Sequence, residues 1–264
     1  MRWRARAVQR YFDAVAATYA ARYAQPGPAG YALASRWQRI WELIGEPPGP
    51  ALDAGCGPGL LLAALAEQGR MAIGVDLSPA MVQLAAVRGP AVVGALEALP
   101  FASGQFGLVV AAGAIEYVAD DQRALAELVR VLRPGGVLIA SFPNRRSPYR
   151  VWKNGVFYPL VGMLRPLVYR LRSLPPPPTV TAYHHHYRVD EVQARLTALG
   201  CRVEEVVFVN LQLLPTPLDE WLAPLAVALA RWLERFGRAP LGRLGTAFLV
   251  RAACAESKDI SQAS

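Results

Sequence analysis

Short apolar segments alternate with helical patterns through the first half of this 264-residue chain. Segments rich in aliphatic residues, which we expect as strands, are followed by segments with an apolar residue at every third or fourth position. This alternation is typical of βαβ units, and near-continuous apolar strands indicate a parallel sheet covered on both faces. The expected strands are 51–54, 71–75, 91–94, 107–112 and 137–142, and the expected helices are 60–68, 79–87 and 120–132.

The second half of the chain is less regular and contains two expected insertions. Residues 144–187 are rich in proline, arginine and aromatic residues, and residues 215–240 carry an apolar stripe with helical spacing. No linker separates two cores, so we predict a single α/β domain over 1–264, a doubly wound, mostly parallel sheet with helical insertions. The remaining expected elements are a helix over 189–199 and strands over 202–209 and 246–251.

The composition is that of a globular protein with a basic surface. Hydrophobic residues make up 53% of the chain and charged residues 18%, which excludes disordered and fibrous classes. The net charge of +8 favours an anionic partner, either nucleic acid or a membrane surface. Cys56, Cys201 and Cys254 lie far apart in the sequence, so we expect no disulfide framework and no CxxC metal pair, and therefore a reducing compartment.

The sequence predicts neither a secretory leader nor a membrane-spanning segment. Arg10 and Asp13 interrupt the N-terminal segment before an apolar core of a leader can form. The longest uncharged run, 98–115, contains turn residues in its middle. We therefore expect a cytoplasmic protein, with peripheral association at the inner membrane face as the alternative.

A glycine-rich loop, Asp53-Ala54-Gly55-Cys56-Gly57-Pro58-Gly59, joins the first expected strand to a helix. Glycines there permit a tight turn and a close approach of the backbone to a ligand at the helix N-terminus. Position 60 is leucine, so the dinucleotide-binding fingerprint fails at its third glycine. Asp76 ends the next strand, where a carboxylate can accept hydrogen bonds from both ribose hydroxyls. Asp53 and Asp76 together suit a nucleoside with a cationic amino-acid end, as in S-adenosylmethionine.

Three further motifs follow the glycine loop along the chain. They are Gly74-Val75-Asp76-Leu77-Ser78 with Met81, Glu97-Ala98-Leu99-Pro100-Phe101, and Val131-Leu132-Arg133-Pro134-Gly135-Gly136. In this order the four motifs resemble those of class I S-adenosylmethionine-dependent methyltransferases, and the quinone-biosynthesis enzymes are the nearest group. The resemblance implies a seven-stranded Rossmann-like sheet of order 3-2-1-4-5-7-6 with S-adenosylmethionine as the cofactor. The chain departs from the family pattern at Ala95 and Gly107, where an acidic residue is common.

The resemblance also implies which residues contact the cofactor. It points to a lid over the cofactor in the N-terminal segment 1–45, where Tyr11, Phe12 and Tyr19 lie at helical spacing. An amphipathic helix packed on the sheet edge is the alternative for that segment. The implied cofactor-binding residues are Tyr19, Asp53, Gly55, Cys56, Gly57, Gly59, Asp76, Leu77, Met81, Leu96, Glu97 and Ala112.

The sequence does not assign a catalytic residue. Methyl transfer from a sulfonium mainly requires positioning, and a general base would help only for an acceptor such as a hydroxyl. Weak candidates are Glu116 and Tyr117, which follow the fourth strand, and His184, although a helix-start role for Glu116 and a core role for Tyr117 are alternatives. The three consecutive histidines 184–186 have no cysteine or acidic partners nearby, so no metal site is predicted.

The first insertion is strongly basic. Between Leu128 and Val189 there are ten basic residues and no acidic residue, with interleaved aromatic residues and an apolar helical stripe over 156–171. One interpretation is an interfacial element that contacts an anionic membrane surface through 145–172. The other is a lid over an apolar substrate, with solvated arginines. Nucleic-acid binding also uses arginine and aromatic residues, but the apolar stripe fits it poorly.

We therefore predict methyl transfer from S-adenosylmethionine to a small acceptor that is apolar or lipid-like, of the quinone-precursor or isoprenoid type. The insertions 144–187 and 215–240 are expected to form the acceptor side. Two alternatives remain open: a methyltransferase of a soluble secondary metabolite, and a non-catalytic partner protein that keeps the cofactor fold. Ala95 and Gly107 favour the last alternative because they depart from the family pattern.

Overall fold

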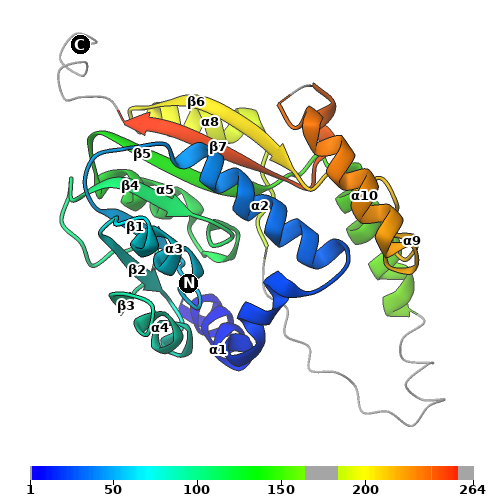
Figure 1. Cartoon of the computed structure of the whole chain (residues 1–264), viewed down its shortest axis with the longest axis horizontal. Helices are drawn as coiled ribbons and strands as arrows, with labels where there is room; N and C mark the ends of the chain where they lie inside the picture. Colours follow the sequence, from blue (N-terminus) through cyan, green and yellow to red (C-terminus); the bar gives the residue numbers. More distant parts are fainter. Residues whose placement is uncertain (1, 164–183, 239, 255–264) are drawn as a thin grey trace.

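A seven-stranded sheet forms the centre of the protein in a computed structural model, which describes residues 2–163, 184–238 and 240–254 (Figure 1). The strand order is β3-β2-β1-β4-β5-β7-β6. β7 runs antiparallel to both of its neighbours, and the other neighbouring pairs are parallel. The predicted α/β class, the mostly parallel sheet and the strand order implied by the resemblance are confirmed.

The strands and helices alternate along the chain as βαβ units require. The strands are β1 (Ala51–Ala54), β2 (Ala72–Asp76), β3 (Ala91–Val93), β4 (Phe106–Ala111), β5 (Leu132–Pro143), β6 (Cys201–Val209) and β7 (Ala247–Cys254). The α-helices are α1 (Arg2–Tyr19), α2 (Pro28–Ile44), α3 (Leu60–Glu67), α4 (Pro79–Ala86), α5 (Asp121–Arg130), α6 (Pro148–Trp152), α8 (Val189–Ala198), α9 (Leu218–Trp221) and α10 (Ala223–Leu233). Short turns of helix are η1 (Ala20–Ala24), η2 (Ile115–Tyr117), η3 (Lys153–Phe157), η4 (Glu234–Phe236) and η5 (Pro240–Leu244).

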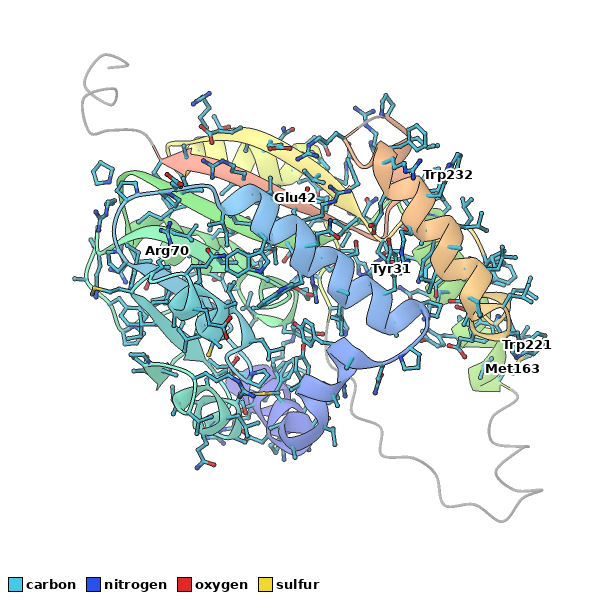
Figure 2. All side chains as sticks on the ribbon, viewed as in Figure 1. Tyr31, Glu42, Arg70, Met163, Trp221 and Trp232 are labelled. Carbon is cyan, nitrogen blue, oxygen red and sulfur yellow. The ribbon has the colours of Figure 1, made fainter. Side chains whose placement is uncertain are left out.

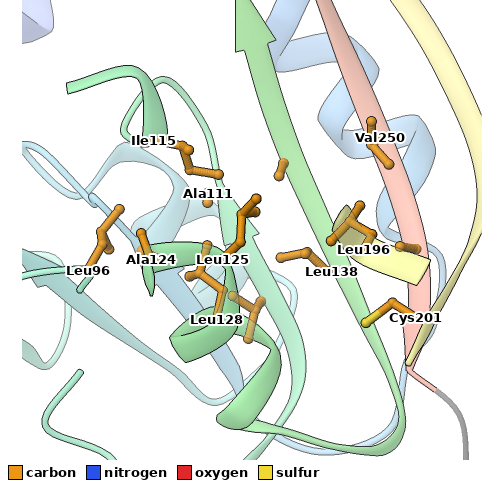
Figure 3. Packing of buried hydrophobic residues seen from close by; sticks show 14 of the residues in the cluster. Leu96, Ala111, Ile115, Ala124, Leu125, Leu128, Leu138, Leu196, Cys201 and Val250 are labelled. Carbon is orange, nitrogen blue, oxygen red and sulfur yellow. The ribbon is translucent and has the colours of Figure 1, made fainter. Parts of the chain in front are cut away.

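Each face of the sheet is covered by its own helices, because successive side chains of a strand point to opposite faces. In β4, Val109 packs with Leu125 of α5 and Leu196 of α8 in the core cluster shown in Figure 3. Its neighbour Leu108 packs instead with Leu43 of α2 and other residues on the opposite face. All six residues of β4 are buried, which explains why the strand reads as a continuous apolar run.

Two of the predicted helices begin with side-chain caps. Ser78 Oγ accepts the backbone N–H of Met81 at 3.2 Å, and Pro79 occupies the first turn of α4. Asp120 Oδ1 accepts the backbone N–H of Arg123 at 2.9 Å and caps α5. The predicted starts of these helices are therefore confirmed to within a residue.

Two elements differ from the predicted bounds. β5 begins at Leu132 rather than 137, because Leu132 pairs with Phe106 before Arg133–Gly136 bulge out and Val137 resumes pairing with Leu108. The second insertion is not one continuous helix, since it breaks at Leu222 between α9 and α10. Pro224 has no backbone N–H to donate to the preceding turn, so the helix ends and begins again.

Both insertions leave and rejoin the fold at the same edge of the sheet. The first is closed by Arg145 and Tyr187, where the N–H of Arg145 donates to the carbonyl of Tyr187 at 2.9 Å. The second is closed by Asn210 Nδ2, which donates to Thr246 Oγ1 at 2.8 Å. The two insertions also contact each other, because Trp152 Nε1 donates to the carbonyl of Thr216 at 2.9 Å. Their helical parts therefore lie side by side at one end of the molecule (Figure 1).

No helix in the described parts of the chain combines the length and apolar character needed to cross a membrane. Residues 156–163 of the predicted apolar stripe are helical, with 156 and 157 in η3, and residues 164–171 lie outside the described residues.

The β6–β7 ladder brings together two cysteines that are distant in sequence. Cys201 pairs with Cys254 across the two strands, and the two sulfur atoms lie 3.0 Å apart as free thiols. Sequence spacing alone predicts no disulfide framework, because it does not reveal which strands are neighbours. Antiparallel pairing therefore creates one site where a single disulfide can form.

We expect mild oxidation with oxidised glutathione to join Cys201 and Cys254, with two molecules of reduced glutathione released. The bond would raise the free energy of unfolding by about 2–4 kcal/mol, because it restricts the unfolded chain. Intact mass and thermal unfolding of the oxidised protein provide the measurement. Cys254→Ser should lose the effect and Cys56→Ser should keep it, whereas three free thiols in the oxidised wild type would contradict the prediction.

Candidate functional site

A cavity lies at the carboxyl ends of β1, β2 and β4, and we call it the first cavity. Its walls come from the glycine loop, the start of α4, the segments 94–97 and 112–119, and the inner sides of α1 and α2. The lining includes eleven of the twelve residues implied by the resemblance: Tyr19, Asp53, Gly55, Cys56, Gly57, Asp76, Leu77, Met81, Leu96, Glu97 and Ala112. The fold therefore brings together side chains from six separate segments.

Gly59, the twelfth residue, is not part of the cavity lining but shapes the glycine loop from behind. It has a φ of 81°, and a Cβ at this position would lie 2.8 Å from the Cα of Ala85. Gly55 has a φ of 80°, and a Cβ there would lie 2.3 Å from the Cβ of Ala114. A side chain at Gly59 would force α4 away from the loop, and one at Gly55 would displace the segment after β4.

Asp76 connects the glycine loop to the start of α4. Its Oδ2 accepts the N–H of Gly57 at 2.8 Å, and its Oδ1 accepts the N–H of Ser78 at 2.9 Å. Burial raises the pKa of the Asp76 carboxyl, while these two backbone hydrogen bonds act in the opposite direction. Each carboxylate oxygen has a second lone pair, so both can still accept a hydroxyl from a ligand.

Asp53 is a buried carboxylate without a compensating charge. Only 4% of the residue is exposed, and its Oδ2 has no hydrogen-bond partner among the described residues. Burial, followed by the nearby charge of Asp76, raises the pKa of Asp53 to about 7. A cationic group in the first cavity would stabilise the ionised form of this side chain.

The N-terminal helix borders the first cavity. Phe12 of α1 packs edge-to-face on Tyr117, with ring centroids 5.1 Å apart, and also approaches Tyr19. Asp13 accepts hydrogen bonds from the hydroxyl of Ser78 and from the backbone N–H of Ala80 at 3.3 Å. α1 is thereby joined to the N-terminus of α4. Its predicted role as a lid stays a prediction, because the contacts define a wall and not a motion.

Glu97 is held by the protein rather than directed at a ligand. Its Oε1 accepts the N–H of Ala119 at 3.0 Å, and its carbonyl accepts Nε of Arg123 at 2.8 Å. Ala95, Leu96 and Glu97 all line the cavity. A ligand would therefore contact mainly the backbone of this segment. Ala95 has no acidic side chain to contribute.

Glu116 is the buried counter-charge of two arginines that the sequence analysis did not identify as site residues. Its Oε2 has no hydrogen-bond partner in the described structure, and burial raises its pKa while Arg36 and Arg150 lower it. Arg36 lines the first cavity from α2, and Arg150 of α6 donates from Nε to the carbonyl of Thr246 at 2.6 Å. No motif marks either arginine, because they meet Glu116 only in the folded chain.

A second cavity, of about 620 Å³, lies between the two insertions and the start of α2. Its polar lining comes from both insertions and from the histidine run: Tyr149, Arg150, Lys153, His184, His186 and Asp219. The first insertion supplies cationic groups, and the second supplies Asp219, whose Oδ2 accepts the hydroxyl of Tyr149 at 2.6 Å. This cavity has both charge types and apolar walls.

Tyr117 and His184 stand between the two cavities. Their ring centroids are 4.6 Å apart, with Tyr117 lining the first cavity and His184 the second. Burial raises the pKa of the Tyr117 phenol, so that it stays protonated. Burial, and then the charge of Arg150, lowers the pKa of His184, so its ring is neutral near pH 7. Of the three weak catalytic candidates, these two reach a cavity and Glu116 does not.

The described residues offer no cluster of three histidine, cysteine or carboxylate side chains that could hold a metal ion. The polar groups of the first cavity suit an organic cation with hydroxyl groups instead. Asp53 and Asp76 are the two carboxylates placed for such a ligand.

Comparison with known proteins identifies the central part of the chain. Residues 52–140 match a family described as a methyltransferase domain. The malonyl-[acyl-carrier protein] O-methyltransferase of Salmonella typhimurium is 38% identical over 121 residues, which are 42% of this chain and 48% of that protein. A methyltransferase of Mycobacterium sp. strain JLS is 33% identical over 134 residues, 49% of this chain and 52% of that protein. The chain thus spans about half the length of these two relatives. It spans 32% and 38% of the length of two further relatives, from Streptomyces fradiae and Mycolicibacterium smegmatis.

Solved structures share the fold at low sequence identity. A SAM-dependent methyltransferase from Thermotoga maritima has a TM-score of 0.59 at 21% identity, covering 92% of this chain and 97% of the other. Magnesium protoporphyrin IX methyltransferase of Synechocystis PCC 6803 has a TM-score of 0.57 at 15% identity, covering 94% and 98%. Residues 52–140 thus match a methyltransferase domain, and the described residues share the Rossmann-like fold of these solved methyltransferases. The predicted fold is confirmed, and the match over 52–140 agrees with the predicted enzyme class.

The ionisation of Asp53 should control ligand binding in the first cavity. With a pKa of about 7 in the free protein, Asp53 is increasingly protonated as the pH falls below neutrality. Affinity for a ligand with an ammonium group should therefore fall by up to about tenfold for each pH unit below 7. Calorimetric titration with S-adenosylmethionine between pH 5.5 and 7 measures this dependence. Asp53→Asn should bind weakly at every pH, and a pH-independent wild type would contradict the assignment.

Proposed function

We propose that this protein transfers a methyl group from S-adenosylmethionine to an amphipathic, lipid-like acceptor whose polar end occupies the second cavity. The observation that supports this proposal most directly is the contact between Tyr117 and His184, at which the two cavities meet. On one side lie two carboxylates suited to the cofactor. On the other side lies the second cavity, whose polar and charged groups come mainly from the insertions and whose apolar wall comes mainly from the start of α2.

The residues of the first cavity fit the proposed cofactor group by group. Asp53 would hold the α-ammonium group, for which its unpartnered oxygen is suited. Asp76 would accept the ribose hydroxyls while it keeps its two backbone hydrogen bonds. Met81 and Leu96 would provide apolar contacts, and the backbone at Leu96 and Glu97 would meet the adenine. When bound, S-adenosylmethionine supplies an electrophilic methyl group on a sulfonium.

His184 is the proposed proton acceptor for a hydroxyl-bearing acceptor molecule. Its lowered pKa keeps the ring neutral, so a ring nitrogen is free to take a proton at neutral pH. Tyr117 remains protonated, and we assign it to positioning rather than to proton removal. Arg150 and Lys153 would attract an anionic group on the same acceptor. A phenolic quinone precursor with an isoprenoid tail has these features.

A carboxylic acid is the second candidate acceptor. Two relatives are named malonyl-[acyl-carrier protein] O-methyltransferase, from Salmonella typhimurium and from Serratia marcescens. A buried guanidinium is well suited to a carboxylate, and Arg150 provides one in the second cavity. A carboxylate needs no base, so this alternative predicts methyl transfer that does not depend on His184.

Asp76→Ala should weaken S-adenosylmethionine binding by roughly 10- to 100-fold, because hydrogen bonds to a charged group contribute about 1.5–3 kcal/mol each. Calorimetric titration of the wild type and the variant measures the effect, and thermal unfolding shows whether the glycine loop has been lost with the anchor. Glu67→Ala, at an exposed position on α3, is the matched control. Wild-type protein that binds no S-adenosylmethionine would remove the basis of the proposed function.

His184→Asn should lower kcat for hydroxyl acceptors by roughly a hundredfold and leave cofactor affinity unchanged. Methyl transfer to a panel of long-chain phenols and carboxylic acids, followed over pH 5.5 to 8, provides the measurement. The wild-type rate should fall at low pH as His184 becomes protonated, and the variant should show no such step. His186→Asn, in the same cavity, is the control. Wild-type kcat in His184→Asn with every phenol would exclude this ring as the base.

A further inference from the structure

Two helical segments place large apolar side chains on the same exposed end of the molecule. We define the apolar face as the exposed residues of 151–163, from the first insertion, together with those of 213–236, from the second. Figure 2 shows Trp221, Trp232 and Met163 pointing outward at this end. Their exposed fractions are 75%, 53% and 72%. The other large exposed apolar residues here are Val151, Trp152, Val156, Tyr158, Leu160, Val161, Leu213, Leu218, Leu222, Leu225 and Phe236.

The polarity of α10 is unlike that of an ordinary surface helix. Its buried face, toward the protein, is made of Ala226, Ala230 and Leu233. Its exposed side carries Leu225 and Trp232, and no charged residue occurs between Trp221 and Ala230. A helix that lies against water normally presents polar residues on its outer side. The sequence of α10 therefore indicates that its outer side, like its buried side, contacts an apolar environment.

Three of the six tryptophans of the protein are exposed on the apolar face. These are Trp152, Trp221 and Trp232, on two different insertions. Tryptophan is enriched where apolar chains meet water at a membrane surface, because its ring is apolar and its N–H is polar. The N–H of Trp152 donates to the carbonyl of Thr216, and 40% of this residue is exposed.

Exposed basic side chains occur within and next to the two segments that carry the apolar face. Arg231, Arg235 and Arg243 are exposed at the end of α10 and just beyond it, and Arg145 and Arg146 are exposed at the start of the first insertion. Glu220 of α9 is an exposed acidic residue and lines the second cavity. Basic residues near an anionic membrane surface each contribute on the order of a fivefold increase in binding at low salt. A second copy of this chain would instead bring like charges together, which opposes a symmetric dimer.

The second cavity lies between the two halves of the apolar face. Asn154 and Tyr158 of the first insertion and Ala223 of the second form part of its lining, and His184 lies at its inner end. A lipid-like molecule could therefore leave its apolar tail in a bilayer while its polar end reaches Tyr117 and His184. In this arrangement the acceptor would pass from the bilayer into the second cavity without first dissolving in water.

We propose that the apolar face, formed by 151–163 and 213–236, docks on an anionic lipid membrane and admits the acceptor from the bilayer into the second cavity. Docking depends only on the exposed tryptophans, the leucines and the adjacent arginines. The entry route rests, in addition, on the proposed methyltransferase function. It extends the membrane contact predicted for 145–172 to the second insertion, and residues 164–172 lie outside the described structure.

The first test is co-sedimentation of the full-length protein with vesicles, without cofactor or acceptor. Vesicles of phosphatidylcholine with phosphatidylglycerol should bind the protein at low salt, and binding should weaken as the salt concentration rises. Vesicles of phosphatidylcholine alone should bind at least about tenfold more weakly. Absence of binding to the anionic vesicles at low salt would overturn the proposal, and this measurement requires no variant.

Substitutions on the apolar face locate the contact. Trp232→Glu and Leu225→Glu should each reduce vesicle binding by roughly tenfold or more, because each places a carboxylate among lipid chains. Trp3→Glu is the matched control, since Trp3 is 68% exposed on α1, away from the apolar face. Circular dichroism checks that all variants are folded. Equal losses in Trp3→Glu and Trp232→Glu would contradict docking through this face, as would a dimer in sedimentation velocity that Trp232→Glu dissociates.

Vesicle binding and cofactor binding are measured separately, so the docking proposal and the proposed methyltransferase function can each be rejected independently. The protein could bind anionic vesicles but fail to bind S-adenosylmethionine. That result would support docking and would contradict the entry route. If both bind, methyl transfer to a long-chain phenol held in vesicles should be lowered by Trp232→Glu, while transfer to a short-chain phenol in water should not change. Equal loss with both acceptors would contradict entry from the bilayer.

Discussion

The site depends on one carboxylate, that of Asp76, which fixes the glycine loop to the end of β2. Its oxygens accept the N–H groups of Gly57 and Ser78, so a single side chain sets the position of the loop and the start of α4. The same charge contributes to the raised pKa of Asp53, about 7. The anchor of the loop and the affinity of the cavity for a cation are therefore coupled, because both carboxylates are buried together.

Buried charges organise the acceptor side as well. Glu116 offsets Arg36 from α2 and Arg150 from the first insertion, so three elements from distant parts of the sequence share one electrostatic cluster. Burying a charge costs several kcal/mol, and the opposite charges of Arg36 and Arg150 reduce that cost for Glu116. Tyr117, next to Glu116 in sequence, packs against His184 at the boundary of the two cavities.

Sequence patterns located most of the elements around the first cavity to within one or two residues. The strands β1 to β4 and the helices α3 and α4 follow from local apolar runs, glycines and caps, which act over short distances. Features that depend on contacts between residues distant in the sequence could not be predicted. The early start of β5 depends on pairing with Phe106, the juxtaposition of Cys201 and Cys254 on strand order, and the roles of Arg36 and Arg150 on packing around Glu116.

The sequence by itself determined the class of the fold, the glycine loop, and the two carboxylates at the ends of β1 and β2. These features are local, since each arises from residues that are neighbours in the chain. Only the tertiary structure decided that the two insertions lie side by side, that a second cavity opens between them, and that His184 meets Tyr117 there. Such contacts depend on which segments the sheet brings together, and no local pattern carries that information.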